Sequence, residues 1–245
     1  MTSEARVTVL MPTFNRPGLV GEAIASVLAQ TFQAWSLWVM NDGGQDVAEA
    51  VKAVARGDAR VCYFDRPHAG KAGTLNWARS RLLTPYVAYL DDDDLWLPEH
   101  LALAIAALDA APGRLAAAYS DVREVRIGPD ERREWVDSWP RIRLTDLLTR
   151  NVINHNALVH RRTLFEDAGP YDERLDVLID WDMIRRMAAR TRFVHVPAVT
   201  VEHRLEVDAA GRVGRRHLTG QADHRRAAYR RSYRRILFKT PWSRS

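Results

Sequence analysis

A regular alternation of short apolar runs with amphipathic segments constrains the fold of this chain most strongly. The apolar runs, which we predict as strands, are residues 6–11, 37–40, 61–64 and 87–90. Apolar side chains recur every three or four residues over 19–30, 47–54 and 75–82, which is typical of helices that pack one face on a core. This order favours an α/β fold with a mostly parallel, right-handed wound sheet that carries helices on both faces.

The second half of the chain lacks this regularity. Residues 140–180 are predicted to form short helices and loops. Longer elements are predicted as a helix after Pro98, strands at 115–119, 193–196 and 198–201, a hairpin at 122–136 around Gly-Pro-Asp-Glu, and a helix at 181–189. We therefore expect one domain at 1–211, made of a nucleotide-binding half (1–110) and an acceptor-binding half (111–211), and a basic C-terminal helical tail at 212–245.

Four consecutive carboxylates, Asp91 to Asp94, follow the fourth predicted strand. Open α/β sheets bind ligands at the carboxyl ends of their strands, and adjacent carboxylates repel one another unless a cation or donors neutralise them. Mg²⁺ or Mn²⁺, with oxygen ligands, would do this. The alternative is a solvated acidic turn with Asp94 as the N-cap of the next helix.

The net charge of +5 is unevenly distributed. Residues 212–245 contain eleven Lys or Arg and one acid, a formal charge of +10, which leaves about −5 on residues 1–211. The single Cys62 excludes an intrachain disulfide and is compatible with a reducing compartment. The N-terminus lacks the pattern of a signal peptide, and no apolar run approaches the roughly 20 residues of a membrane span. We expect a cytoplasmic protein.

The tail is predicted to form a basic amphipathic helix. Tyr229, Tyr233, Ile236 and Leu237 recur at helical spacing among arginines. Three interpretations are open: docking of Tyr229, Tyr233 and Leu237 on the body, binding to an anionic membrane surface where lipid-linked acceptors would lie, and nucleic-acid binding. The last is the least favoured, because no nucleic-acid module accompanies the tail.

Five motifs in this order resemble the family 2 glycosyltransferases with a GT-A fold. They are VTVLMPTFNR (7–16), VMNDGG (39–44), AGKAGTLNWA (69–78), LDDDDLWLP (90–98) and IDWDMIRRM (179–187). The resemblance covers roughly residues 5–205. It implies an inverting transfer of a sugar from a nucleotide diphosphate donor of UDP, dTDP or GDP type to a saccharide or lipid-linked acceptor. A divalent metal would stabilise the leaving diphosphate.

The resemblance assigns roles within the acidic cluster. Asp93 matches the metal ligand of the DxD segment, and Asp91 or Asp92 matches the position that holds donor hydroxyls. Asp94 is left to cap the following helix. His203, after the strand at 198–201, is a candidate further metal ligand, and a histidine without a metal role is the alternative.

Four further residues match donor-side positions of the family. Pro12 and Phe14 belong to the first motif, with Phe14 near the base or simply in the core. Asp42 would accept a hydrogen bond from the nucleobase, or form an Asx-turn before two glycines. Lys71 suits the phosphates as a point charge, or is merely solvated.

Asp180 matches the general base that takes the proton of the acceptor hydroxyl. Ile179 departs from the family's acidic residue at that position, and an N-cap is the alternative role for Asp180. Asp182 would point elsewhere on a helix. His155, Trp139 and Trp181 are candidates for the acceptor pocket.

Two other functions are conceivable. A sugar nucleotidyltransferase shares a similar sheet, but the glycine-rich, arginine-containing loop expected after its first strand is replaced by Pro-Thr-Phe-Asn-Arg. A catalytically silent sugar-nucleotide-binding protein would be expected to lack the metal or base carboxylate, and both Asp93 and Asp180 are present.

Overall fold

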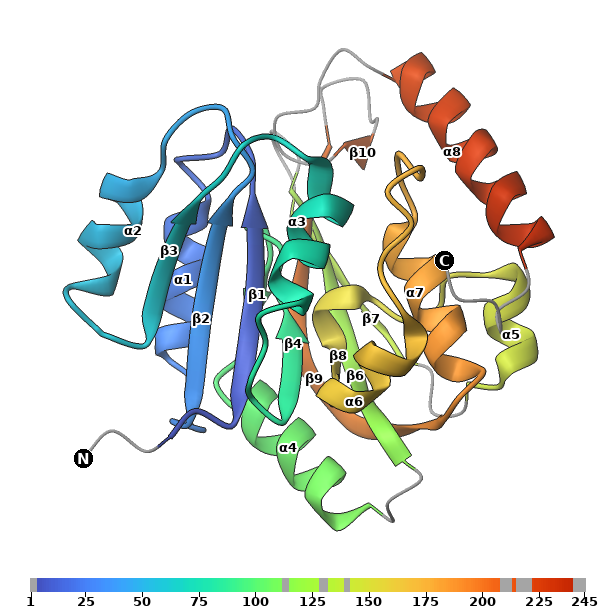
Figure 1. Ribbon diagram of the computed structural model, residues 1–245, viewed down its shortest axis with the longest axis horizontal. Coiled ribbons are helices and arrows are strands. Elements are labelled where there is room, and N and C mark those ends of the chain that lie inside the picture. The colour runs from blue at the N-terminus through green and yellow to red at the C-terminus, as the bar shows by residue number, and fades with distance from the viewer. Residues whose placement is uncertain are drawn as a thin grey trace.

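The computed structural model describes residues 4–111, 115–127, 132–138, 142–207, 213–214 and 222–239. In its first half, strands and helices alternate as predicted (Figure 1). The elements are β1 (Val7–Thr13), α1 (Val20–Leu28), β2 (Trp35–Asn41), α2 (Ala48–Ala55), β3 (Val61–Asp65), α3 (Gly70–Arg79) and β4 (Tyr86–Tyr89). Strands β4, β1, β2 and β3 lie side by side and parallel, which confirms the wound α/β sheet.

The second half extends the same sheet with mixed strand directions. The elements are β5 (Leu95–Trp96), α4 (His100–Ala110), β6 (Leu115–Ile127), β7 (Arg132–Asp137), α5 (Leu144–Thr149), the 3₁₀ turn η1 (His155–Ala157), β8 (Leu158–Arg161), α6 (Arg162–Ala168), α7 (Ile179–Ala188), β9 (Arg192–Val207), β10 (Val213–Gly214) and α8 (Ala222–Phe238). The sheet order is β10-β9-β6-β8-β4-β1-β2-β3, with β8 antiparallel to both β4 and β6. The predicted hairpin is present as β6 and β7.

Two predicted pairs of strands are single strands in the structure. Residues 115–127 form β6 without a break, and 192–207 form β9 across Pro197. The register between β6 and β9 shifts at Ser120 and Asp121, so a bulge absorbs the proline, which cannot donate to a ladder. The hydroxyl groups of buried Ser120 and Thr200 hydrogen-bond each other at 2.6 Å across the two strands.

Helices cover both faces of the sheet, as predicted. One core cluster joins the sheet to α1, α2 and α4, and the other joins it to α3, α6, α7 and α8. Helix α3 begins at Gly70, five residues before the predicted start. Asp42 accepts hydrogen bonds from Ala69 N and Thr74 Oγ1, both at 2.8 Å, and this tertiary anchor fixes the first turn despite its glycines.

Helix α8 packs against α7 at the end of the molecule away from α2 (Figure 1). Its inward side chains are Ala228, Ser232 and Ile236, at a spacing of four residues, and Ile236 is fully buried. The docking interpretation was therefore correct for Tyr233, which is partly buried and packs on the core. It was wrong for Leu237 and Tyr229, which are 41% and 50% exposed.

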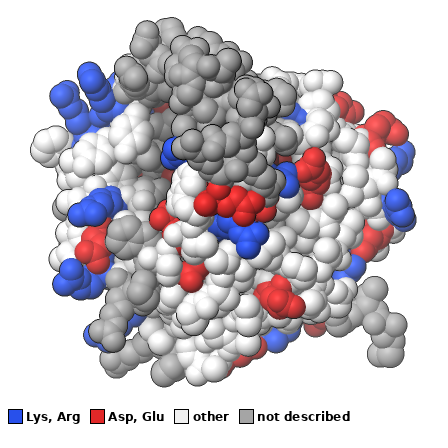
Figure 2. Space-filling view, turned by 180° about the vertical axis from the view of Figure 1, so that it is seen from behind, with Lys and Arg blue, Asp and Glu red and all other residues white. Residues whose placement is uncertain are grey.

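The charged surface is mixed on the face opposite to that of Figure 1, where acidic and basic side chains intermingle (Figure 2). Among the residues that the structure describes, no helix is long and apolar enough to cross a membrane.

Candidate active site

The carboxyl ends of β1, β2 and β4 lie together at one edge of the sheet because the three strands are parallel and adjacent. They carry Thr13 to Arg16, Asp42 and the acidic cluster, respectively. The fold thus brings together residues that are up to 81 positions apart in the sequence, as expected for a site at strand ends.

Three of the four clustered carboxylates converge. Asp91, Asp93 and Asp94 each offer an oxygen, and these oxygens lie within 4.8 Å of one another. Asp92 turns away: its two oxygens accept hydrogen bonds from Thr13 Oγ1 at 2.6 Å and Arg16 at 2.7 Å. Burial raises the pKa of Asp92, while Arg16 and Thr13 act in the opposite direction.

Asp94 does not cap a helix, so that prediction was wrong. Helix α4 begins at His100, and Asp94 is fully buried. Its carboxylate accepts hydrogen bonds from His203 Nδ1 at 2.9 Å and from Arg204 N at 2.8 Å, both on β9, and from the side-chain amide of Asn156. These bonds tie the acidic cluster to the second half of the sheet.

The converging oxygens fit a hard divalent cation. Mg²⁺ and Mn²⁺ prefer oxygen ligands, and several carboxylates in such a small volume need positive charge. Asp93, which the sequence predicted as the metal ligand, is in the converging group. His203 is adjacent through Asp94. No observation tests their roles as ligands, which remain predictions.

Two basic side chains supply positive charge to the cluster. Lys71 forms an ion pair with Asp91, and Arg16 bonds both Asp92 and Asp93, at 2.7 and 2.9 Å. Lys71 was predicted from the sequence as a donor-side residue. Arg16 was missed as a site residue, although it ends the first motif, two residues after Phe14.

Asp42 lies buried where β2 ends, and its carboxylate oxygens are already bonded to other groups of the protein. Besides Ala69 N and Thr74, His68 Nδ1 lies 3.0 Å from its second oxygen. Gly43, with φ of +78°, packs so closely that a Cβ there would lie 3.0 Å from His68 N. Asp42 thus anchors the loop before α3, and a contact with a nucleobase stays a prediction.

Phe14 is not a core residue: it is 43% exposed, and its ring stacks on His68 at 4.7 Å. Pro12 is the sixth residue of β1, opposite Met40 of β2, beyond the part of β1 that pairs with β4. A proline fits there because no ladder bond to β4 is required of it. Both residues lie near the edge of the sheet where the parallel strands end, and their contact with a donor stays a prediction.

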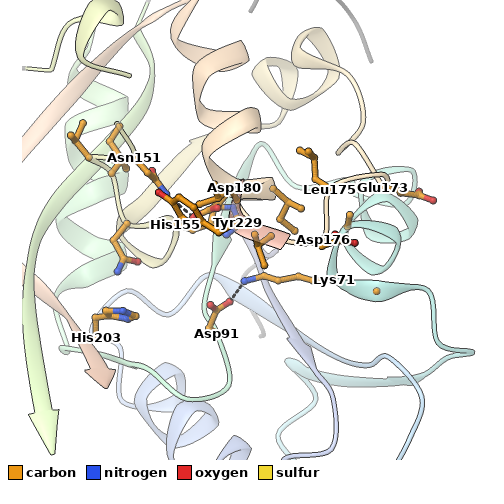
Figure 3. Close-up of a pocket in the computed structure, with 18 of the residues that line it drawn as sticks. Lys71, Asp91, Asn151, His155, Glu173, Leu175, Asp176, Asp180, His203 and Tyr229 are labelled. Atoms are coloured by element: carbon orange, nitrogen blue, oxygen red, sulfur yellow. Dashed lines mark hydrogen bonds and ion pairs between the residues drawn. The ribbon is translucent and has the colours of Figure 1, made fainter. Parts of the chain in front are cut away.

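A cavity of about 840 Å³ lies between the acidic cluster and the start of α7 (Figure 3). Asp91, Lys71 and His203 line it from the cluster side. Asp180 and Asn151 line it from the opposite side, where Asn151 Nδ2 donates to Asp180 Oδ2 at 3.0 Å. Phe14, Asp42 and Asp93 are not among its lining residues.

Asp180 occupies the first turn of α7 and makes no capping bond. The N-cap is Leu178, in the left-handed conformation with φ of +63° and without a side-chain cap, so the alternative role as N-cap is excluded. Asp182 points away from the cavity, as predicted, and pairs with Arg186 and Lys239 at 3.0 Å. Asp180 is therefore the carboxylate of α7 that reaches the cavity.

Of the predicted acceptor residues, His155 lines the cavity, Trp181 does not, and Trp139 lies outside the described residues. Trp181 is 1% exposed, donates from Nε1 to Leu147 O at 2.8 Å and stacks on Tyr233. A sugar ring cannot reach it, and that prediction was wrong.

A hydrogen-bond chain fixes the state of His155. His160 Nδ1 must donate to Arg161 O, so Tyr89 donates to His160 Nε2 at 2.8 Å. Tyr171 then donates to Tyr89, and His155 Nε2 donates to Tyr171 at 3.1 Å. Burial lowers the pKa of His155 to about 3, so the ring is neutral at pH 7. With the proton on Nε2, Nδ1 is unprotonated, and it has no hydrogen-bond partner among the described residues.

The fold is of GT-A type, with an acidic cluster where the parallel strands end. The model of glycosyl transferase family 2 matches residues 8–167, about two thirds of the sequence. The chain therefore belongs to glycosyl transferase family 2. Membership favours glycosyl transfer over the nucleotidyl transfer that the sequence left open.

Relatives agree with this assignment. The chain is 28% identical over 207 residues to an uncharacterised glycosyltransferase of Rickettsia typhi, covering 80% of this chain and 61% of that protein. It is 32% identical over 101 residues to WfgD of Escherichia coli, a UDP-Glc:α-D-GlcNAc-diphosphoundecaprenol β-1,3-glucosyltransferase, covering 41% and 40%. The chain thus spans about 60% or less of the length of these relatives.

Solved structures share the fold. TarS residues 1–349 of S. aureus, also solved with UDP and with UDP-GlcNAc, superposes with a TM-score of 0.66 at 17% identity, over 81% of this chain and 60% of that one. A mannosyltransferase of Pyrobaculum calidifontis in complex with GDP-Man and Mn²⁺ gives 0.62 at 20% identity, over 82% and 57%.

Proposed function

We propose that this protein is a metal-dependent, inverting glycosyltransferase that moves a sugar from a nucleotide diphosphate sugar to an acceptor hydroxyl. One observation carries the proposal: Asp91 of the acidic cluster and Asp180 of α7, 89 positions apart in sequence, line one cavity from opposite sides. The donor's diphosphate belongs at the cluster and the attacking hydroxyl at Asp180, with the transferred sugar between them.

The cluster is the proposed metal and diphosphate site. Asp93, with Asp91 and Asp94, would hold Mn²⁺ or Mg²⁺, and a bound metal would neutralise charge that develops on the leaving diphosphate. Solved complexes of similar folds with UDP and with GDP-Man and Mn²⁺ support this assignment. Asp92 is bound by Thr13 and Arg16, so Asp91 is the better candidate of the two for contact with the donor.

Lys71 and Arg16 now neutralise the carboxylates. The side chain of Lys71 is one third exposed and lines the cavity. We propose that it turns to the diphosphate when a bound metal neutralises Asp91 in its place. Phe14 and Asp42 would contact the nucleobase at the edge of the sheet where β1 and β2 end.

Asp180 is the proposed general base. It lines the cavity and is held by a neutral donor, Asn151, which leaves its charge uncompensated by a salt bridge among the described residues. An ionised carboxylate of this kind can take the proton of an acceptor hydroxyl while the new glycosidic bond forms, and return it to solvent after transfer.

Turnover of UDP-, dTDP- and GDP-sugars with and without Mn²⁺ tests the proposal. We expect hydrolysis or transfer of one donor class that requires the metal. Asp180→Asn should keep donor binding and remove transfer, whereas Asp58→Asn, on the loop before β3, should match the wild type. No turnover of any donor with either metal state, or full transfer by Asp180→Asn, would contradict the proposal.

A lipid-linked acceptor and peripheral membrane association are the proposed setting. The matching segment of WfgD belongs to an enzyme that acts on a diphosphoundecaprenol-linked sugar. Helix α8 exposes Arg230 and Arg234 on its outer surface, and such side chains favour an anionic membrane. This setting also implies the cytoplasmic face of a membrane.

Liposome sedimentation tests this association. The protein should sediment with anionic and not with neutral vesicles, and Arg230→Gln with Arg234→Gln should reduce sedimentation. Lys52→Gln with Arg56→Gln, an equal loss of exposed charge on α2 and the residue that follows it, should not reduce sedimentation. Equal and negligible sedimentation with both vesicle types would refute the association.

A further inference from the structure

Helix α8 lies outside the segment that matches the family model, yet one of its side chains reaches the cavity. Tyr229 lines the cavity together with Asp180 and His155, and it is 50% exposed (Figure 3). An aromatic ring that is half-exposed at the wall of a polar cavity offers one face to a ligand, because its phenol ring is apolar and its hydroxyl remains wet.

A ladder of three rings holds Tyr229 in place. Tyr229 stacks on Tyr233 with centroids 5.9 Å apart and planes 14° apart, and Tyr233 stacks on Trp181 at 5.3 Å and 26°. Trp181 is buried, anchored on Leu147 O, and directly follows Asp180 in the chain. The ladder therefore ties the ring of Tyr229 to the same turn of α7 that presents Asp180.

Contacts at both ends of this region fix α8 against the body. Arg231 pairs with Asp176 of the cavity wall at 2.8 Å, and Arg185 donates to Ile236 O. Lys239 bonds Asp182 at 3.0 Å. Tyr229 is thus pre-organised, which lowers the entropic cost of using its ring for binding.

The remaining cavity wall is rich in carboxylates. Those lining it are Asp91, Glu124, Asp137, Glu173, Asp176 and Asp180. Among the lining residues that the structure describes, Lys71 is the one lysine or arginine, and it is paired with Asp91. Carboxylates accept hydrogen bonds from sugar hydroxyls, but they repel a second anion.

We infer that Tyr229 is the stacking platform for the acceptor, and that the acceptor ring it takes is an uncharged hexopyranose rather than a uronate. The apolar C–H face of the ring packs on Tyr229, and its hydroxyls face the carboxylates and Asp180. This inference rests on the proposed function, because it identifies the ligand of the acceptor side of the same cavity. It makes α8 a part of the active site rather than an appendage.

Saturation-transfer NMR on the full chain with UDP and Mn²⁺ present tests the inference. The probes are methyl β-D-glucopyranoside, methyl β-D-galactopyranoside, methyl α-D-mannopyranoside and methyl β-D-glucuronide. We expect at least one neutral probe to bind, and the glucuronide to bind about tenfold more weakly than methyl glucoside or not at all.

Tyr229→Ala should bind the neutral probe about tenfold more weakly than the wild type. Tyr229→Phe should bind it with wild-type affinity, because stacking needs the ring and not the hydroxyl. Phe238→Ala removes another exposed ring of α8, 87% exposed, and should bind as the wild type does. A thermal melt of Tyr229→Ala confirms that the protein remains folded.

Three results would overturn the inference: no neutral probe binds, Tyr229→Ala binds as tightly as the wild type, or the glucuronide binds as tightly as methyl glucoside. Calorimetry of UDP, dTDP and GDP on the same samples separates the two proposals. If nucleotide binding is normal, any of these results refutes this inference and leaves the proposed transfer reaction standing. If Tyr229→Ala loses probe binding as expected but the wild type binds none of the nucleotides, only the proposed transfer reaction is refuted.

Discussion

Three buried histidines should make this protein sensitive to mild acid. Burial lowers the pKa of His100 to about 3, of His155 to about 3 and of His160 to about 4, all from an ordinary value near 6.5. Each is therefore neutral in the folded protein and becomes charged on unfolding below pH 6.5. Below pH 6.5 the unfolded chain binds more protons than the folded protein. The contribution of these histidines to the free energy of unfolding is therefore fully present above pH 6.5 and is lost as the pH decreases towards 3 to 4.

The size of the effect follows from these values. Each histidine costs about 1.4 kcal/mol per pH unit well below pH 6.5, which amounts to roughly 2 kcal/mol at pH 5. Together the three remove about 6 kcal/mol, a large part of the 5 to 15 kcal/mol that is typical of a folded domain. The raised pKa of Asp92 acts in the opposite direction, so a variant specific to one histidine is needed.

His100 offers that variant. It stacks on Trp96 at 4.2 Å, away from the cavity-lining residues, and bonds Thr200 through Nδ1. The assay is guanidinium unfolding followed by tryptophan fluorescence at pH 7 and pH 5. Between these two pH values, the free energy of unfolding of His100→Phe and of His100→Gln should each fall by about 2 kcal/mol less than that of the wild type. Their absolute stabilities will differ because their packing differs. If the loss between pH 7 and 5 equals that of the wild type in both variants, the burial argument is refuted.

Three further perturbations test the fold and the site. Ile236→Ala should lower the free energy of unfolding by about 2 to 5 kcal/mol in denaturant titrations, because it empties a fully buried position, whereas Phe238→Ala should change it by about 0.5 kcal/mol at most. Lys71→Met should weaken diphosphate binding about tenfold by calorimetry and leave binding of the free nucleoside unchanged. Asp42→Ala should cost about 1 to 3 kcal/mol of stability, since Ala69 N and Thr74 lose their acceptor; an unchanged unfolding midpoint would contradict this role.

The parallel half of the fold could be predicted from the sequence because its signals are local. Buried parallel strands are continuous apolar runs, and helices between them repeat every three or four residues. The same logic placed the acidic cluster, Asp42 and Lys71 at one edge, because parallel strands end together. Asp180 was identified by its match to the fifth motif. The structure then excluded the alternative role of Asp180 as the N-cap of α7, because Leu178 occupies that position.

Features that depend on distant partners could not be predicted. Asp94 looked like a cap because it precedes a helix, but its partners His203 and Arg204 lie on β9, more than 100 residues away. β8 has only four residues and follows a 3₁₀ turn, too short for a periodic signal. On α8, apolar spacing alone indicated Leu237, whereas Ser232 is buried because its small side chain lets the helix approach the body.

Calorimetric titration of UDP, dTDP and GDP with and without Mn²⁺ tests the central claim, that the converging carboxylates form a cation site for a nucleotide diphosphate, most directly. The wild type should bind one of the three nucleotides much more tightly with Mn²⁺. Asp93→Asn should lose this gain while its circular dichroism spectrum and melting temperature stay near those of the wild type. Equal affinity of Asp93→Asn and the wild type in Mn²⁺, or a wild-type affinity that Mn²⁺ does not change, would contradict the account.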